Sequence, residues 1–208
     1  MSIKSNFFAK FKEIEGFVFR FDTRIYLNEI SSPNCNDVCI GSVVGKNPGS
    51  AKEEIKLDNG YSIINLDGDK LLPTTKNIVS KFNIKTPKER AYIQVLNLFY
   101  LCDKDLNKAL NTYNLFKEDK KLLCTTETKD FPFVWYLWGV GNSSLNKMKD
   151  RFRDNIKTQR NFFFKKEKGN FEPIERIPRN DELAKHTQGL PYINNPTIKD
   201  YINNFNIS

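Results

Sequence analysis

Three polar side chains occur at or near the ends of apolar stretches, where reactive groups of a folded chain often gather. Asn47 follows the apolar run 38–44, Asn97 interrupts the run YIQVLNLFY, and His186 lies in a late loop rich in Gly and Pro. An amide can orient a water molecule or read a hydrogen-bonding edge, and an imidazole can donate to a developing negative charge. Taken alone, each of these residues can be explained by a structural role. A shared chemical role therefore depends on whether the fold brings the three together.

The loop containing Asn47 reads Gly45-Lys46-Asn47-Pro48-Gly49-Ser50. It lacks the spacing and the Lys-Ser/Thr ending of a phosphate-binding P-loop, and no three-glycine dinucleotide fingerprint follows any predicted strand. A proline between Asn and Gly makes a stiff turn, which would fix Asn47 at a strand tip and expose the amides of residues 49 and 50 to an anion. The loop is therefore a candidate anion site or an ordinary strand-to-helix turn.

Apolar runs alternate with helical patterns along the chain. Near-continuous apolar runs at 38–44, 92–100 and 133–138, with a short one at 161–165, are typical of buried parallel strands. Helical spacing occurs at 72–82 and 103–118 and in a basic stretch that follows Asn142 or Ser143, while AKEEI (51–55) is compatible with a helix.

These patterns predict a single α/β domain over residues 1–208. We expect a three-layer sandwich with a central, mostly parallel four-stranded sheet, preceded by an N-terminal antiparallel ribbon (16–30) and followed by a loop-rich tail (173–208) that carries His186. Ligands of such sheets bind in the loops at the carboxyl ends of the strands, so residues 45–50, Asn97 and residues 139–144 are expected to border one site, with His186 as a further candidate.

Basic charge is concentrated in one segment. The chain has 33 Lys+Arg against 25 Asp+Glu, a net charge of +8, part of which an AT-rich, Lys-rich composition would explain. Residues 145–168 hold nine basic and three acidic side chains, so this segment alone carries +6 (9 − 3) of that charge. The basic residues are Lys147, Lys149, Arg151, Arg153, Lys157, Arg160, Lys165, Lys166 and Lys168. The segment is a solvated face or a surface that follows a phosphate backbone.

The cysteines do not suggest a metal site. Cys35 and Cys39 are separated by three residues and Cys102 and Cys124 stand alone, a spacing that disfavours an iron–sulfur cluster and favours reduced thiols. We expect no metal and no other cofactor. No apolar run approaches the roughly 20 residues of a membrane span, and the first residues show no signal peptide. We therefore expect a cytoplasmic monomer without a membrane partner.

Four ordered motifs carry a family resemblance. VCIGSVVGKNPGS, YIQVLNLF, FVWYLWGVG and AKHTQGLP, within about residues 16 to 192, resemble the uracil-DNA glycosylase superfamily. The chain also resembles a bacterial family of unassigned function that has N-P-S, N-L-F and W-G motifs. Two departures matter: Asn47 stands where many members have Asp, and Thr187 rather than Pro follows His186. Residues 142–145, Asn-Ser-Ser-Leu, are a rival for the late loop.

The resemblance implies a DNA glycosylase that flips a modified or damaged pyrimidine out of DNA and hydrolyses its N-glycosidic bond. Asn47 and His186 would be catalytic, and Asn97 and Tyr61 would bind the base. Contacts to the DNA backbone would come from Lys46, Ser50, Asn142, Ser143, Lys147, Lys149, Arg151 and Gln188.

The target and the biological role stay open at this point. The first motif lacks the Asp-Pro-Tyr with which uracil specialists exclude bulk, so a phage-type modified cytosine ranks slightly above uracil, in an antiviral or a repair role. The alternatives are a non-catalytic DNA-binding module on the same fold and an N-glycosidase of free nucleosides or nucleotides.

Overall fold

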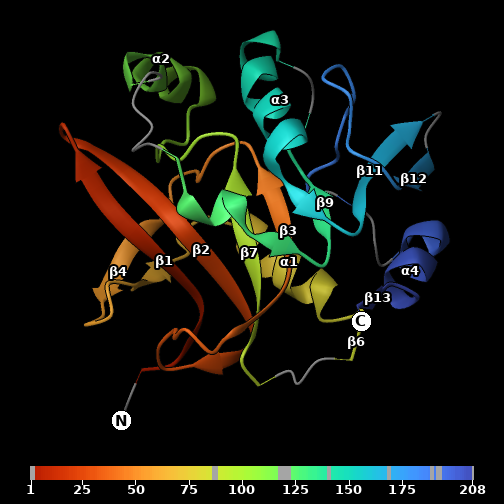
Figure 1. Ribbon diagram of the computed structural model, residues 1–208, viewed down its shortest axis with the longest axis horizontal. Helices are drawn as coiled ribbons and strands as arrows, with labels where there is room; N and C mark the ends of the chain where they lie inside the picture. The colour runs from red at the N-terminus through yellow and green to blue at the C-terminus, as the bar shows by residue number, and fades with distance from the viewer. Residues whose placement is uncertain are drawn as a thin grey trace.

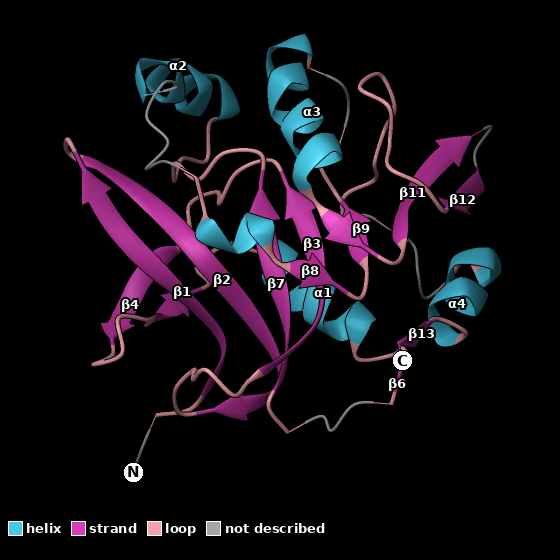
Figure 2. Cartoon of the chain, viewed as in Figure 1, coloured by secondary structure: helices cyan, strands magenta, loops and turns pink. Residues whose placement is uncertain are grey.

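A computed structural model describes residues 3–85, 89–116, 123–139, 142–167, 170–187, 190 and 194–207. Its main feature is a nine-stranded mixed sheet with the strand order β12-β11-β9-β3-β7-β2-β1-β5-β4 (Figures 1 and 2). The strands of this sheet are β1 (Ser5–Ile14), β2 (Phe17–Ile30), β3 (Val38–Gly45), β4 (Lys52–Lys56), β5 (Ser62–Asn65), β7 (Ala91–Asn97), β9 (Val134–Tyr136), β11 (Asn161–Glu167) and β12 (Asn170–Ile174).

Four neighbouring strands of this sheet, β7, β3, β9 and β11, run parallel to one another. On one side β2 pairs antiparallel with β7 and continues the sheet through β1, β5 and β4, and on the other side β12 pairs antiparallel with β11. Two short pairs, β8 (Asp130–Phe131) with β10 (Lys157–Thr158) and β6 (Asn83–Ile84) with β13 (Asn206–Ile207), lie outside it.

The prediction of a three-layer sandwich with a central, mostly parallel four-stranded sheet is therefore wrong. The N-terminal ribbon is not an appendage, because Thr23 of β2 pairs with Val95 of β7 and the hairpin becomes part of the sheet. The stretch AKEEI (51–55), compatible with a helix by sequence, falls largely within β4, which pairs with β5. Backbone pairing satisfies the edge of β7 that a four-stranded sheet would leave open.

Helices cover both faces of the sheet. They are α1 (Leu71–Val79), α2 (Leu106–Phe116), α3 (Asn146–Asn155) and α4 (Pro196–Asn203), with short 3-10 turns at Thr125–Thr128 and Ser143–Leu145. Side chains alternate along each strand, so Val43 joins the core cluster of α1 and α4, and Val44 joins that of α2 and α3. Figure 1 shows α2 and α3 at the top of the view, with α3 near the end of β3 and α2 on the side of the β1–β2 hairpin.

The β1–β2 hairpin turns at Glu15 and Gly16, both of which have positive φ angles of 52° and 78°. A turn with positive φ at two consecutive residues has a backbone twist that matches the right-handed twist of the flanking strands. Under the hairpin, a third apolar cluster includes Phe8, Tyr26 and Tyr61. Among the described residues, no helix is long and apolar enough to cross a membrane.

Gly41 in β3 makes a close approach that leaves no room for a side chain. A Cβ atom placed there would lie 2.2 Å from the ring of the buried Phe133. We expect Gly41→Ala to lower the free energy of unfolding by about 1–3 kcal/mol, because the ring must leave a packed site. Urea denaturation measures this. Val38→Ala, at an exposed position of the same strand, serves as the control, and an equal loss in both variants would contradict the explanation.

Candidate functional site

A cleft of about 530 Å³ opens at the carboxyl ends of β3 and β9. Its walls are residues 46–50 after β3, residues 68–71 at the amino end of α1, Leu137 and Gly139 after β9, Lys104 before α2, and His186 in the late loop. Three lysines and the histidine face one carboxylate, that of Asp69, so the cleft favours an anionic ligand.

The position of this cleft follows from the connections of the sheet. After β3 the chain forms β4 and β5 at the edge of the sheet and then α1 on one face, whereas after β9 it passes to α3 on the other face. The segments leaving these two adjacent parallel strands therefore diverge. In open sheets this divergence opens a crevice, which is the usual ligand site.

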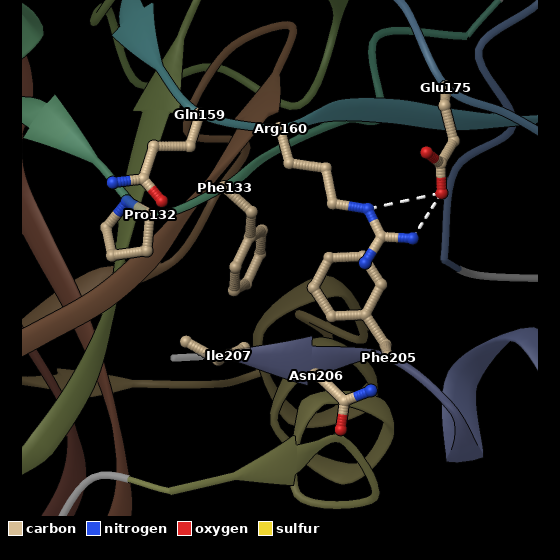
Figure 3. A pocket seen from close by; sticks show the side chains of 8 residues that line it. All are labelled: Pro132, Phe133, Gln159, Arg160, Glu175, Phe205, Asn206 and Ile207. Atoms are coloured by element: carbon tan, nitrogen blue, oxygen red, sulfur yellow. Dashed lines mark hydrogen bonds and ion pairs between the residues drawn. The ribbon is translucent and has the colours of Figure 1, made fainter.

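A second cavity, of about 370 Å³, lies at the opposite, amino ends of β9 and β11 (Figure 3). Its main polar group is Arg160, which pairs with Glu175 and lies with its guanidinium carbon 4.1 Å from the centre of the Phe205 ring. Because this ion pair and the ring already engage Arg160, the second cavity is a weaker candidate than the cleft.

Asn47 is held in a defined orientation in the cleft wall. Its Nδ2 donates a hydrogen bond of 2.7 Å to the carbonyl oxygen of Asp103, in the loop that precedes α2. This bond ties the loop after β3 to the helix on the other face. It also leaves the amide oxygen of Asn47 as the group that can accept a hydrogen bond from a ligand or a water molecule.

Lys46 lies deep in the same wall, against the backbone of Gly139. Its Nζ is 3.2 Å from the point where a Cβ atom of Gly139 would stand, so the glycine makes room for the amine. Burial lowers the pKa of Lys46. Lys149 of α3 is fully buried nearby, and burial together with the charge of Lys46 lowers its pKa.

Lys149 does not reach the surface. Its Nζ donates a hydrogen bond of 2.8 Å to the carbonyl oxygen of Asn180 and lies 5.8 Å from the centre of the Trp138 ring. The residue therefore holds the segment around Asn180 against α3, a structural task different from the DNA contact that the sequence suggested.

His186 stands in the cleft wall, near the charged residues Asp69, Lys46 and Lys185. Burial lowers the pKa of its imidazole, the carboxylate of Asp69 opposes this shift, and Lys46 and Lys185 add to it. The neutral imidazole, with one nitrogen donating and the other accepting, is thus the main form at pH 7.

The depressed pKa of His186 makes a prediction about stability. The unfolded chain binds this proton near pH 6.5 and the folded protein only at lower pH, so stability is complete above 6.5 and is lost as the pH falls through the folded pKa. We expect His186→Gln to lose less stability than the wild type between pH 7.5 and 5 in urea titrations. Other titrating groups cancel in the difference, and identical slopes would refute the prediction.

Asp69 organises the opposite wall. Its Oδ1 accepts hydrogen bonds from the backbone nitrogens of Leu71 (2.8 Å) and Leu72 (3.3 Å) and so caps α1, while its Oδ2 lies 3.8 Å from Nη1 of the buried Arg20. The sequence interpretation missed Asp69 and Lys104. An acidic residue two positions before an apolar helical pattern is a recognisable cap signal.

Asn97 lies beneath the cleft and is not part of its wall. The side chain is 1% exposed, and neither of its amide atoms has a hydrogen-bond partner within the described residues. Its Oδ1 is 3.0 Å from the point where a Cβ atom of Gly45 would stand, and Leu71, a wall residue, is 3.8 Å from the same point. Asn97 is therefore adjacent to the cleft floor.

Tyr61 lies outside the cleft. Its hydroxyl donates to Asp22, and Lys10 and Arg24 lie over its ring at 4.7 and 4.8 Å. It packs under the β1–β2 hairpin in the third apolar cluster. The structure therefore brings together Asn47 and His186, places Asn97 below them, and separates Tyr61 from them.

The other predicted contact residues have different surroundings. Ser50 borders the cleft, Ser143 and Lys147 are exposed, and Asn142 accepts a hydrogen bond from the backbone nitrogen of Ser144. Arg151 pairs with Glu127 at 3.0 Å and donates to the carbonyl oxygen of Leu98. Gln188 falls outside the described residues.

Ion pairs neutralise much of the basic segment 145–168. Besides Arg151, its members Arg153, Arg160 and Lys165 pair with Asp150, Glu175 and Glu167. The exposed lysines Lys147, Lys157 and Lys166 lie on α3, β10 and β11, so the segment does not present its full formal charge as one surface.

The four cysteines are free thiols, and the described residues contain no group of three or more His, Cys, Asp or Glu side chains placed to hold a metal ion. Comparisons with protein-family models, with curated proteins and with solved structures found no match to the chain. The geometry of the cleft is therefore the basis for the functional inference.

Proposed function

We propose that the protein is a DNA glycosylase that binds a flipped, modified or damaged pyrimidine nucleotide in this cleft and hydrolyses its N-glycosidic bond. The observation that carries the proposal is that Asn47 and His186, far apart in sequence, line one lysine-rich cleft at the divergence of β3 and β9. A volume of about 530 Å³ is within the usual range for small-molecule sites.

Hydrolysis of the N-glycosidic bond requires stabilisation of two groups, the sugar and the departing base. Breaking the bond builds positive oxocarbenium character on the sugar and negative charge on the departing base. The amide oxygen of Asn47, held by the bond to Asp103, orients the attacking water, and an N–H of neutral His186 donates to the base as it becomes anionic. The amide is barely basic, so its contribution is positioning rather than proton abstraction.

Two lysines of the cleft wall, Lys70 and Lys104, hold the phosphates that flank the flipped nucleotide. Two phosphate contacts would give a log–log salt slope of about −1.8 for duplex DNA. Base reading by Asn97 would require ligand access past Gly45 and Leu71.

A second candidate function is an N-glycosidase of free nucleosides or nucleotides. Two ion pairs favour it, that of Arg151 with Glu127 and that of Arg160 with Glu175, because these carboxylates lie outside segment 145–168 and reduce the charge it offers to a long phosphate backbone. It uses the same cleft and the same side chains, and it differs only in needing no DNA.

The test offers both kinds of substrate to the wild-type protein. Oligonucleotides containing uracil, oxidised pyrimidines, or hydroxymethylated or glucosylated cytosine are incubated with it, treated with alkali and analysed for strand breaks, while the matching free nucleosides and nucleotides are analysed for base release. Breaks at one modified position support the DNA glycosylase, base release from monomers alone supports the second function, and no release from any substrate contradicts both.

A further inference from the structure

The cleft contains an amine in the position of a nucleophile. Lys46 precedes Asn47 in the loop after β3, and its side chain extends along the wall as far as Gly139 after β9. It therefore borders the space that, under the proposed function, a bound nucleotide would occupy, next to Asn47.

Burial favours the neutral form of Lys46. The groups that interact with it include the buried Lys149 of α3 and His186 of the late loop, and neither of them is acidic. The nearest acidic wall residue, Asp69, is directed to the amino end of α1 and to Arg20. Among the described residues no carboxylate forms an ion pair with Lys46, and burial lowers its pKa. Desolvation and a cationic neighbour are the usual means of activating a lysine as a nucleophile.

We propose that Lys46 gives the protein a second activity, a lyase reaction in which its amine forms a Schiff base with C1′ of an abasic deoxyribose and the DNA strand breaks at the 3′ side. This inference rests on the proposed function in one respect, namely that the cleft admits a nucleotide of DNA. It does not require that the protein itself removes the base.

The reaction balances without an oxidant or a reductant. Nζ of Lys46 attacks the C1′ aldehyde, the carbonyl oxygen leaves as water with the two hydrogens of the amine, and an imine forms. His186, which lines the same cleft in its neutral form, takes a proton from C2′. The electron pair of that C–H bond forms the C2′–C3′ double bond while the C3′–O bond breaks, and the strand with a 5′-phosphate departs. Hydrolysis of the imine returns the amine and the unsaturated sugar aldehyde.

The experiment supplies abasic DNA ready made. The full-length protein is mixed with a 5′-labelled oligonucleotide that carries one abasic site, with and without sodium borohydride, which reduces an imine to a stable amine. We expect strand cleavage without borohydride and a covalent protein–DNA adduct with it. Peptide mass mapping of the wild-type adduct is expected to place the reduced sugar on Lys46.

Variants identify the nucleophile. Lys46→Arg keeps the positive charge and removes the nucleophilic amine, so adduct and cleavage are expected to fall to the level without protein, whereas Lys56→Gln, at an exposed position of β4 that is not part of the cleft wall, still forms the adduct. Mass mapping on the wild type does not depend on the folding of any variant.

Three results would overturn the inference: no adduct with the wild type, an adduct mapped to another lysine, or an adduct with Lys46→Arg at the wild-type level. Base release from modified DNA without any adduct would refute only the proposed lyase activity. An adduct on Lys46 without base release from any substrate would refute only the proposed glycosylase activity.

Discussion

Asn47→Ala is expected to lower the single-turnover rate of base release about 100-fold, the loss typical of a misplaced reactant. The variant removes the amide oxygen that orients the water and the Nδ2 bond to Asp103, which fixes the loop after β3. The rate is measured with the best substrate from the oligonucleotide panel, with enzyme in excess over DNA.

Asn142→Ala is the matched control for this prediction. Asn142 belongs to the rival loop and caps a short 3-10 turn by accepting from the backbone nitrogen of Ser144. Because Asn142 is not among the residues of the cleft wall, the rate of base release is expected to stay close to that of the wild type. The assignment to Asn47 is wrong if Asn142→Ala abolishes base release and Asn47→Ala does not.

Glu127→Ala is expected to destabilise the protein by about 3 kcal/mol, because it leaves Arg151 without its buried partner. The Glu127 carboxylate accepts hydrogen bonds from the Arg151 guanidinium (3.0 and 3.2 Å) and from the Tyr100 hydroxyl (2.6 Å). Its side chain is 8% exposed and that of Arg151 is 17% exposed. Equilibrium unfolding in urea gives the change in free energy.

Glu175→Ala provides the comparison for a surface pair. Glu175 is 51% exposed and pairs with Arg160, so its loss is expected to cost less than about 1 kcal/mol. Equal costs for the two substitutions would show that the Glu127–Arg151–Tyr100 network is not the buried anchor that its geometry indicates.

Strands and helices with strong local patterns could be predicted from the sequence. The apolar runs became β3, β7, β9 and β11, and helical spacing located α1 and α2. Residues 52–56 were not predictable in this way, because their local pattern is compatible with a helix and only pairing with β5 makes them a strand. The same holds for the pairing of β2 with β7, which joins residues more than seventy positions apart (Thr23 and Val95).

The candidate site was predictable where it depends on strand ends. Asn47 and His186 line one cleft, as the rule for parallel strands suggests. Asn97, the last residue of β7, is buried below the cleft because β7 is an inner strand between β3 and β2. Charge counting could not reveal that Arg151 is paired, since Glu127 lies 24 residues away in sequence.

The central claim, that this cleft hydrolyses an N-glycosidic bond, is tested most directly by detecting the free base itself. Wild-type protein and Asn47→Ala are each incubated with the modified oligonucleotides, and the small-molecule fraction is analysed by mass spectrometry. The account predicts one free pyrimidine base released for each abasic site or strand break formed, and about 100-fold more slowly by Asn47→Ala. No free base with the wild type, or equal release by both proteins, would contradict it.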